Sequence, residues 1–141
     1  MIDVENMVTD LIIAGLSTGY ASANVTSAYV EEAAKYPCVT VRQVNSIPLK
    51  RMNTADSAEN YTTVYFEITA YSDKKDKGQS ECRSLLKLVD GYITAKGFER
   101  TYLSEVFNRN RSITWRYARY RAVIRAPITI GNDTVYEVYR R

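Results

Sequence analysis

The sequence predicts an α+β fold, with a mainly antiparallel sheet and two helices packed on one face of it. Two stretches, 62–71 and 115–127, place apolar residues at every second position, the period of two that strands show. Two others, 4–16 and 82–93, place apolar residues at the spacing of a helix that buries one side. Strands follow each helix, an order typical of helices collected on one face of an antiparallel sheet. At 141 residues we expect a single domain, 1–141.

The first helix is expected close to the N-terminus, with a length of about four turns. Asp3 is suited to cap its start, because a short acidic side chain accepts hydrogen bonds from backbone N–H groups there. Gly19 is suited to end it, because glycine readily adopts the left-handed conformation. The apolar stripe of this helix consists of Val4, Val8, Leu11, Ile12 and Leu16.

The region after the first helix mixes strand and loop signals. Residues 22–36 are ambiguous: a short strand around Val25 and a helical turn in the second half of the segment both fit the sequence. The β-branched residues of 38–44 follow a proline and predict a strand. Residues 45–60 are polar and show neither period, which predicts a long mobile loop. A functional loop and an ordinary hairpin extension both remain open for it.

The second helix is expected to end at Gly97, and its apolar stripe consists of Cys82, Leu85, Leu86, Val89 and Ile93. A short strand over 98–107 and a basic turn over 108–111 are expected to follow it. The last two strands, 113–130 and 134–139, are separated by Gly-Asn-Asp, a signal for a tight hairpin.

The two alternating strands carry different residues on their two faces. The even positions include Phe66, Ile68 and Ile124 and fit a core, whereas the odd positions are mostly aromatic or charged. Aromatic and arginine side chains are enriched where proteins contact one another. If the strands pair, the odd positions form one surface, which we interpret as an assembly surface. With the basic turn, the predicted interface or channel residues are Tyr65, Glu67, Tyr71, Arg109, Arg111, Trp115, Tyr117, Arg119, Arg121 and Arg125.

Little in the chain points to catalysis. It contains no histidine, which removes the commonest general base and most zinc sites, and it has no glycine-rich phosphate-binding motif. Cys38 and Cys82 lie far apart in sequence and are expected to be reduced, buried thiols. We therefore expect a protein that is not an enzyme, with no catalytic residue, no cofactor and no metal. An enzyme using carboxylates or one cysteine is the weakest alternative.

Nucleic-acid binding is the stronger alternative. Residues 98–141 hold nine arginines, no lysine and four acidic residues, within a net charge of only +3. A surface on which bases stack would use Arg109, Arg111, Arg116, Arg119, Arg121 and Arg125, interleaved with Trp115, Tyr117 and Tyr120. A plainer interpretation is also open, in which Arg119 and Arg121 pair with Glu67 across the sheet as a solvated network.

The order of these features resembles that of the small tail terminator or tail-completion proteins of tailed bacteriophages, often described as minor capsid or tail components. The resemblance covers nearly the whole chain. It consists of an N-terminal helix before the proline-led strand 36–41, a polar loop, and the strand 64–71. A glycine-containing link, 74–78, then leads into the second helix, which ends in 95–100, before a basic strand and a terminal hairpin.

The resemblance implies a structural subunit that forms a ring, typically a homohexamer, at the end of the tail tube. Such a ring stops tube growth and joins the tail to the head. The implied partners are further copies of the chain, the tail tube protein and a head-completion or connector protein, with DNA passing through the channel. The implied location is the head–tail junction of the virion, assembled in the bacterial host cytoplasm. The N-terminus lacks the features of a secretory signal, and no stretch is apolar enough to span a bilayer, so no membrane partner is expected.

Overall fold

The computed structural model describes residues 4–19, 24–26, 37–48, 61–74, 77–109, 113–130 and 133–138. Within these residues the chain forms two helices and one seven-stranded sheet. The elements in chain order are α1 (Glu5–Gly19), β1 (Asn24–Thr26), β2 (Cys38–Pro48), β3 (Tyr61–Ser72), α2 (Gly78–Ala95), β4 (Glu99–Leu103), β5 (Phe107–Arg109), β6 (Ile113–Ile130) and β7 (Asp133–Val138).

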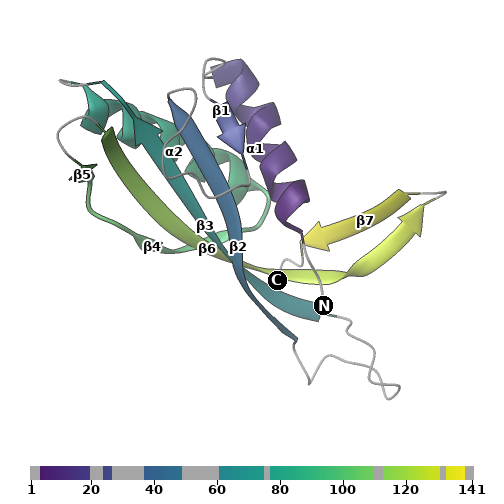
Figure 1. Ribbon diagram of the computed structural model, residues 1–141. Coiled ribbons are helices and arrows are strands. Elements are labelled where there is room, and N and C mark those ends of the chain that lie inside the picture. The colour runs from purple at the N-terminus through teal and green to yellow at the C-terminus, as the bar shows by residue number, and fades with distance from the viewer. Residues whose placement is uncertain are drawn as a thin grey trace.

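The sheet is centred on β3 and β6, which run antiparallel in one unbroken register from Tyr61 opposite Arg125 to Ser72 opposite Thr114. β2 and then β1 extend the sheet beyond β3, and β1 is the one described strand that runs parallel to its neighbour. Along the other edge of β6, the strands β5, β4 and β7 pair with successive parts of it (Figure 1). The predicted mainly antiparallel sheet is thus confirmed.

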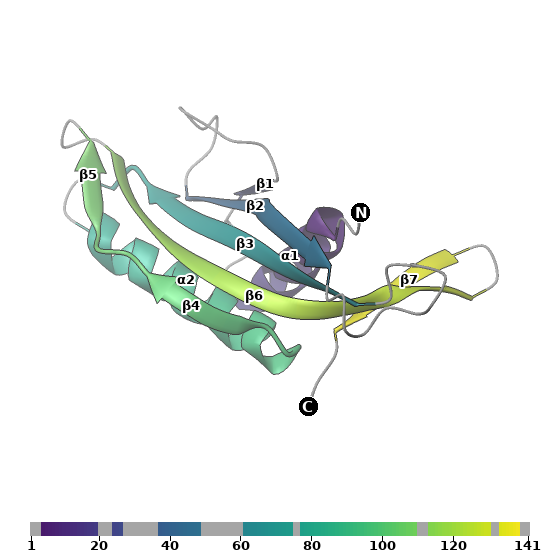
Figure 2. The same cartoon turned by 90° about the horizontal axis from the view of Figure 1, so that it is seen from below.

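Both helices lie on the same face of the sheet (Figures 1 and 2). The buried stripe of α1 consists of Val4, Val8, Ile12 and Leu16, and that of α2 of Cys82, Leu85, Leu86, Val89 and Ile93. They pack on the sheet residues Val39, Val41, Val64, Phe66, Ile68, Ala118, Tyr120 and Ile124. This confirms two helices on one sheet face. Neither described helix is long and apolar enough to cross a membrane.

Most expected element ends agree with the structure. α1 ends at Gly19, while Asp3 lies outside the described residues. Gly97 has a φ of 98°, and its N–H donates to the Thr94 carbonyl as α2 ends. This left-handed conformation is the reason that glycine occurs there. The ambiguous segment 22–36 contributes the strand β1, and its residues 22–23 and 27–36 lie outside the described part of the chain.

Two expected boundaries are corrected by the structure. The predicted loop 45–60 begins too early, because β2 continues to Pro48 after an irregularity between Gln43 and Asn45. The irregularity is a bulge, which shifts the residue pairing without ending the strand. A search for a strict period of two therefore misses the part of the strand after the bulge. Residues 49–60 lie outside the described part. The expected strand 98–107 is two short strands, β4 and β5, and β5 includes part of the expected basic turn.

The two cysteines are free and fully buried, as predicted. The Cys82 thiol lies 3.5 Å from the Ala70 carbonyl oxygen and 3.4 Å from that of Thr114. Burial, with the neighbouring Glu81 carboxylate, raises the pKa of Cys82 to about 12 despite Arg116, and burial also raises the pKa of Cys38. Both thiols are therefore protonated and shielded near neutral pH.

Candidate functional site

The face of the sheet opposite the helices is the candidate site, and we call it the open face. On β3 and β6 it carries the odd-numbered residues, because the even-numbered ones point into the core. The register sets Tyr65 beside Arg121 and Tyr71 beside Trp115. The structure therefore brings the odd-numbered side chains of β3 and β6 to one surface, and neither described helix lies over it (Figure 2).

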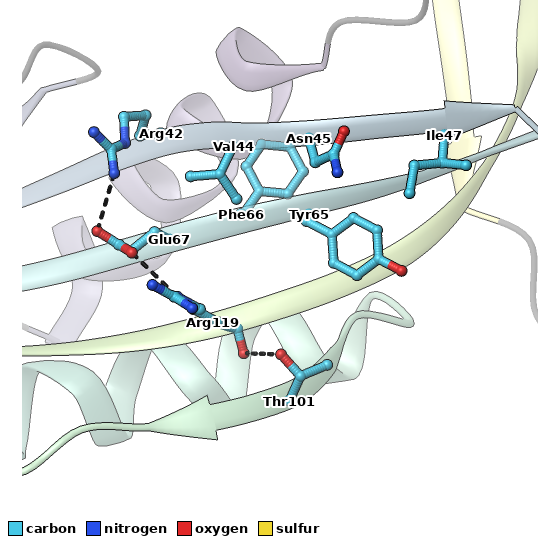
Figure 3. Close-up of a pocket in the computed structure, with 9 residues that line it drawn as sticks. All are labelled: Arg42, Val44, Asn45, Ile47, Tyr65, Phe66, Glu67, Thr101 and Arg119. Carbon is cyan, nitrogen blue, oxygen red and sulfur yellow. Dashed lines mark hydrogen bonds and ion pairs between the residues drawn. The ribbon is translucent and has the colours of Figure 1, made fainter.

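A chain of ion pairs crosses three strands of the open face. Glu67 on β3 accepts from Arg42 Nη2 at 3.3 Å and from Arg119 Nε at 3.2 Å (Figure 3). The Arg42 and Arg119 side chains are 51% and 53% exposed, whereas Glu67 is 19% exposed. The pairing of Arg119 with Glu67, which belongs to the plainer interpretation of a solvated network across the sheet, is therefore present. Arg121 does not join it, because its nearer partner is Glu99 on β4, at 3.0 Å.

At the ion pairs the open face is hollowed into a groove of about 560 Å³. The groove is lined by Arg42, Val44, Asn45, Ile47, Tyr65, Phe66, Glu67, Thr101 and Arg119 (Figure 3). Val44 and Ile47 are 43% and 45% exposed, although each is a large apolar side chain. The groove therefore joins exposed apolar surface to two guanidinium groups held by one carboxylate.

An aromatic cluster, formed by Tyr102, Phe107, Trp115 and Tyr117, occupies the other end of the open face. The Phe107 ring stacks on Trp115 with centroids 5.4 Å apart, and it lies parallel to Tyr117 at 6.2 Å. Tyr102 lies 5.8 Å from Tyr117, and the Arg119 guanidinium lies 5.6 Å from the Tyr117 ring centroid. Arg119 thus links the aromatic cluster to the ion-pair chain through a cation–π contact.

The structure does not place every predicted residue on this face. Arg111 lies outside the described residues, and only the backbone of Arg109, in β5, is described. Arg116 and Tyr120, which the nucleic-acid interpretation included, belong to the opposite side. Arg116 Nε donates to the Ser104 carbonyl oxygen at 2.9 Å, and the buried Tyr120 hydroxyl donates to Asp90 at 2.8 Å. Both occupy even positions, which a period of two assigns to the helix side.

Several open-face residues were not predicted from the sequence. Arg42 could have been predicted from the period of two. It is an even-numbered residue of β2, whereas the buried Val39 and Val41 are odd-numbered and point to the other face. Val44 and Ile47 follow the bulge, so their position could not be derived from the period. Tyr102 and Phe107 belong to short strands whose pairing with β6 has no local signal.

The side chains of the open face are of the kinds that bind a partner. It presents aromatic rings, guanidinium groups and carboxylates already engaged in ion pairs. In the described part of the chain, no three His, Cys, Asp or Glu side chains gather closely enough to hold a metal ion. A scan against models of known protein families finds no match, and a search of curated proteins also finds none.

Proposed function

We propose that the protein is a structural assembly subunit of a phage tail or a phage-tail-like particle. In this proposal it forms a homo-oligomeric ring, a hexamer by analogy, that terminates the tail tube and joins it to the head-proximal connector. Its partners are then further copies of the chain, the tail tube protein and a connector protein, with DNA passing through the channel. It works without catalysis or a cofactor, in the virion at the head–tail junction after assembly in the host cytoplasm.

The observation that carries the proposal is the composition of the open face. It combines the aromatic cluster, the groove and exposed arginines on one side of a sheet whose other side is filled by helices. Four of its large apolar side chains are more than a third exposed, namely Val44, Ile47, Tyr102 and Phe107. Exposed apolar side chains gathered on one face of a protein are typical of interaction sites. Aromatic and arginine side chains are also those that contribute most to binding between proteins.

The test is to measure the mass of the purified protein in solution and to image it with tail tubes. We expect a ring-sized oligomer that binds tube ends. Phe107→Asp should abolish tube binding while leaving the fold intact, because Phe107 is an exposed part of the aromatic cluster. Lys87→Asp is the matched control, since Lys87 is exposed on α2, on the opposite side. A monomer that ignores tube ends would contradict the proposal.

Nucleic-acid binding is a second candidate because the Phe107 and Trp115 rings stack on an exposed surface. Rings of this kind are platforms for bases in single-stranded nucleic acid. Against it, Arg42, Arg119 and Arg121 are already paired with carboxylates. This candidate requires binding to single-stranded DNA that weakens steeply as salt rises and that Trp115→Ala removes. Binding that is absent at low salt would exclude it.

A further inference from the structure

The outer side of α1 has a composition that complements the groove. Its exposed stripe consists of Asn6, Asp10, Ile13 and Ser17, spaced three or four residues apart. Ile13 is 45% exposed, and it is the one exposed large apolar side chain of the described α1. Asp10 adds a negative charge one turn before it. The helix therefore presents an acid and an apolar side chain side by side.

The groove places positive charge next to apolar side chains, which complements the acid and the apolar side chain on α1. Arg42 and Arg119 share Glu67, which leaves one positive charge in excess at the ion-pair chain. A guanidinium has five N–H donors, so each arginine keeps donors beyond the one directed at Glu67. Val44 and Ile47 lie along the same groove and supply the apolar partner surface.

We propose that the outer stripe of α1 in one copy of the chain docks in the groove of the next copy. Ile13 packs between Val44 and Ile47, and the Asp10 carboxylate accepts hydrogen bonds from the two groove arginines. The occupant is a second copy because this chain itself carries the matching acid and apolar pair. The inference rests on the proposed ring and names the two surfaces that build it.

The positions of the two surfaces give this contact a direction. α1 lies on the helix side of the sheet, and the groove lies on the open face (Figures 1 and 3). A contact between two different surfaces is head-to-tail, so it repeats from copy to copy and gives a ring when the rotation closes. Such a contact uses the groove but leaves the aromatic cluster available for another component.

Cross-linking of two single-cysteine additions tests the contact. Ile13→Cys and Ile47→Cys proteins are purified separately and treated with a short bis-maleimide, alone and mixed. The native thiols do not interfere, because Cys38 and Cys82 are fully buried. We expect a cross-linked dimer only in the mixture. Ser84→Cys, exposed on α2, replaces Ile13→Cys in the matched control and should give no product with Ile47→Cys. Ile47→Cys cross-linking to itself, or equal yield with Ser84→Cys, would overturn the inference.

Charge exchange provides the second readout. Asp10→Arg should weaken self-association about tenfold or more, because it sets like charges against each other in a contact. Arg42→Asp should weaken it as well, and the two substitutions together should restore much of the association. Circular dichroism checks that each variant is folded. If the double variant associates no better than the single ones, the contact is wrong.

The outcomes separate this contact from the proposed function. Rings that cap tail tubes without the cross-link between Ile13→Cys and Ile47→Cys would refute the contact and leave the function standing. The cross-link together with failure to bind tail tubes would support the contact and refute the function. A protein that stays monomeric at high concentration would refute both.

Discussion

The two faces of the same central strands differ sharply in what their side chains do. On the helix side, Phe66, Ile68 and Ile124 are completely buried. One residue away along β3, Tyr65 and Glu67 face the groove. Because successive side chains of a strand point to opposite faces, a single sequence period separates a core from a surface. Neighbouring substitutions in β3 and β6 should therefore act on stability when they lie on the helix side and on assembly when they lie on the open face.

The largest effect should come from Phe66→Ala compared with Tyr65→Ala. Phe66 is fully buried and packs edge-on against Phe98, with ring centroids 5.9 Å apart. Its truncation should lower the free energy of unfolding by about 3–5 kcal/mol. Tyr65 is only half-buried on the open face, so its truncation should cost about 1 kcal/mol or less. Urea unfolding measures both losses, and equal losses would show that the two faces contribute alike to stability.

Gly15→Ala should show that the helical layer is also tightly packed. A Cβ at Gly15 would lie 2.4–2.8 Å from ring atoms of Tyr92 on α2, so the ring must move. Overpacking costs about 1–3 kcal/mol, more than the roughly 1 kcal/mol that helix propensity gains when glycine is replaced. Gly91→Ala is the control, because nothing beyond its own helical turn lies within 4 Å of the added Cβ, and it should stabilise the protein. Thermal melts that rise for both variants would contradict the close packing.

Alkaline pH should weaken the helix side through Cys82. Burial raises the pKa of this thiol from 9.0 to about 12, so the folded state keeps a proton that the unfolded state loses. Stability should be unaffected by this group below pH 9. It should fall by up to about 1 kcal/mol per pH unit between pH 9 and 12. Tyr120, whose pKa burial and Asp90 also raise, acts in the same direction.

The measurement is urea unfolding at several pH values from 8 upward. Cys82→Ala should be less stable than the parent at pH 8 and should lose less stability as pH rises, because it has no thiol to ionise. Parallel pH profiles for the two proteins would show that Cys82 is not responsible.

The sequence was sufficient for the parts of the fold that depend on local periodicity. The stripes of both helices, the two faces of β3 and β6, and the end of α2 at Gly97 were all predicted and are confirmed. The same period of two places Tyr120 and Arg116 on the helix side, so including them in a stacking surface conflicted with the pattern itself.

The rest of the candidate site depends on pairing between segments that are distant in sequence. Tyr102 and Phe107 belong to the aromatic cluster because β4 and β5 pair with β6. The local sequence of these short strands does not predict which strand they pair with. Val44 lines the groove after a bulge that no alternation predicts. Arg121 forms its ion pair with Glu99, and not with Glu67, because β4 pairs with β6. These parts of the candidate site thus arise from contacts between residues far apart in sequence.

The smallest effect on stability, and the sharpest test of what the open face does, is expected from Glu67→Gln. The substitution keeps the shape of the side chain and removes the charge that Arg42 and Arg119 share. Because both arginines are half exposed, the loss of stability should be about 1 kcal/mol or less and should shrink in high salt. The Asp10 carboxylate of a neighbouring copy would then be the remaining acid for both guanidinium groups. Self-association measured by sedimentation should therefore become tighter while unfolding becomes easier. If association weakened together with stability, Glu67 would be maintaining the groove for a partner other than α1.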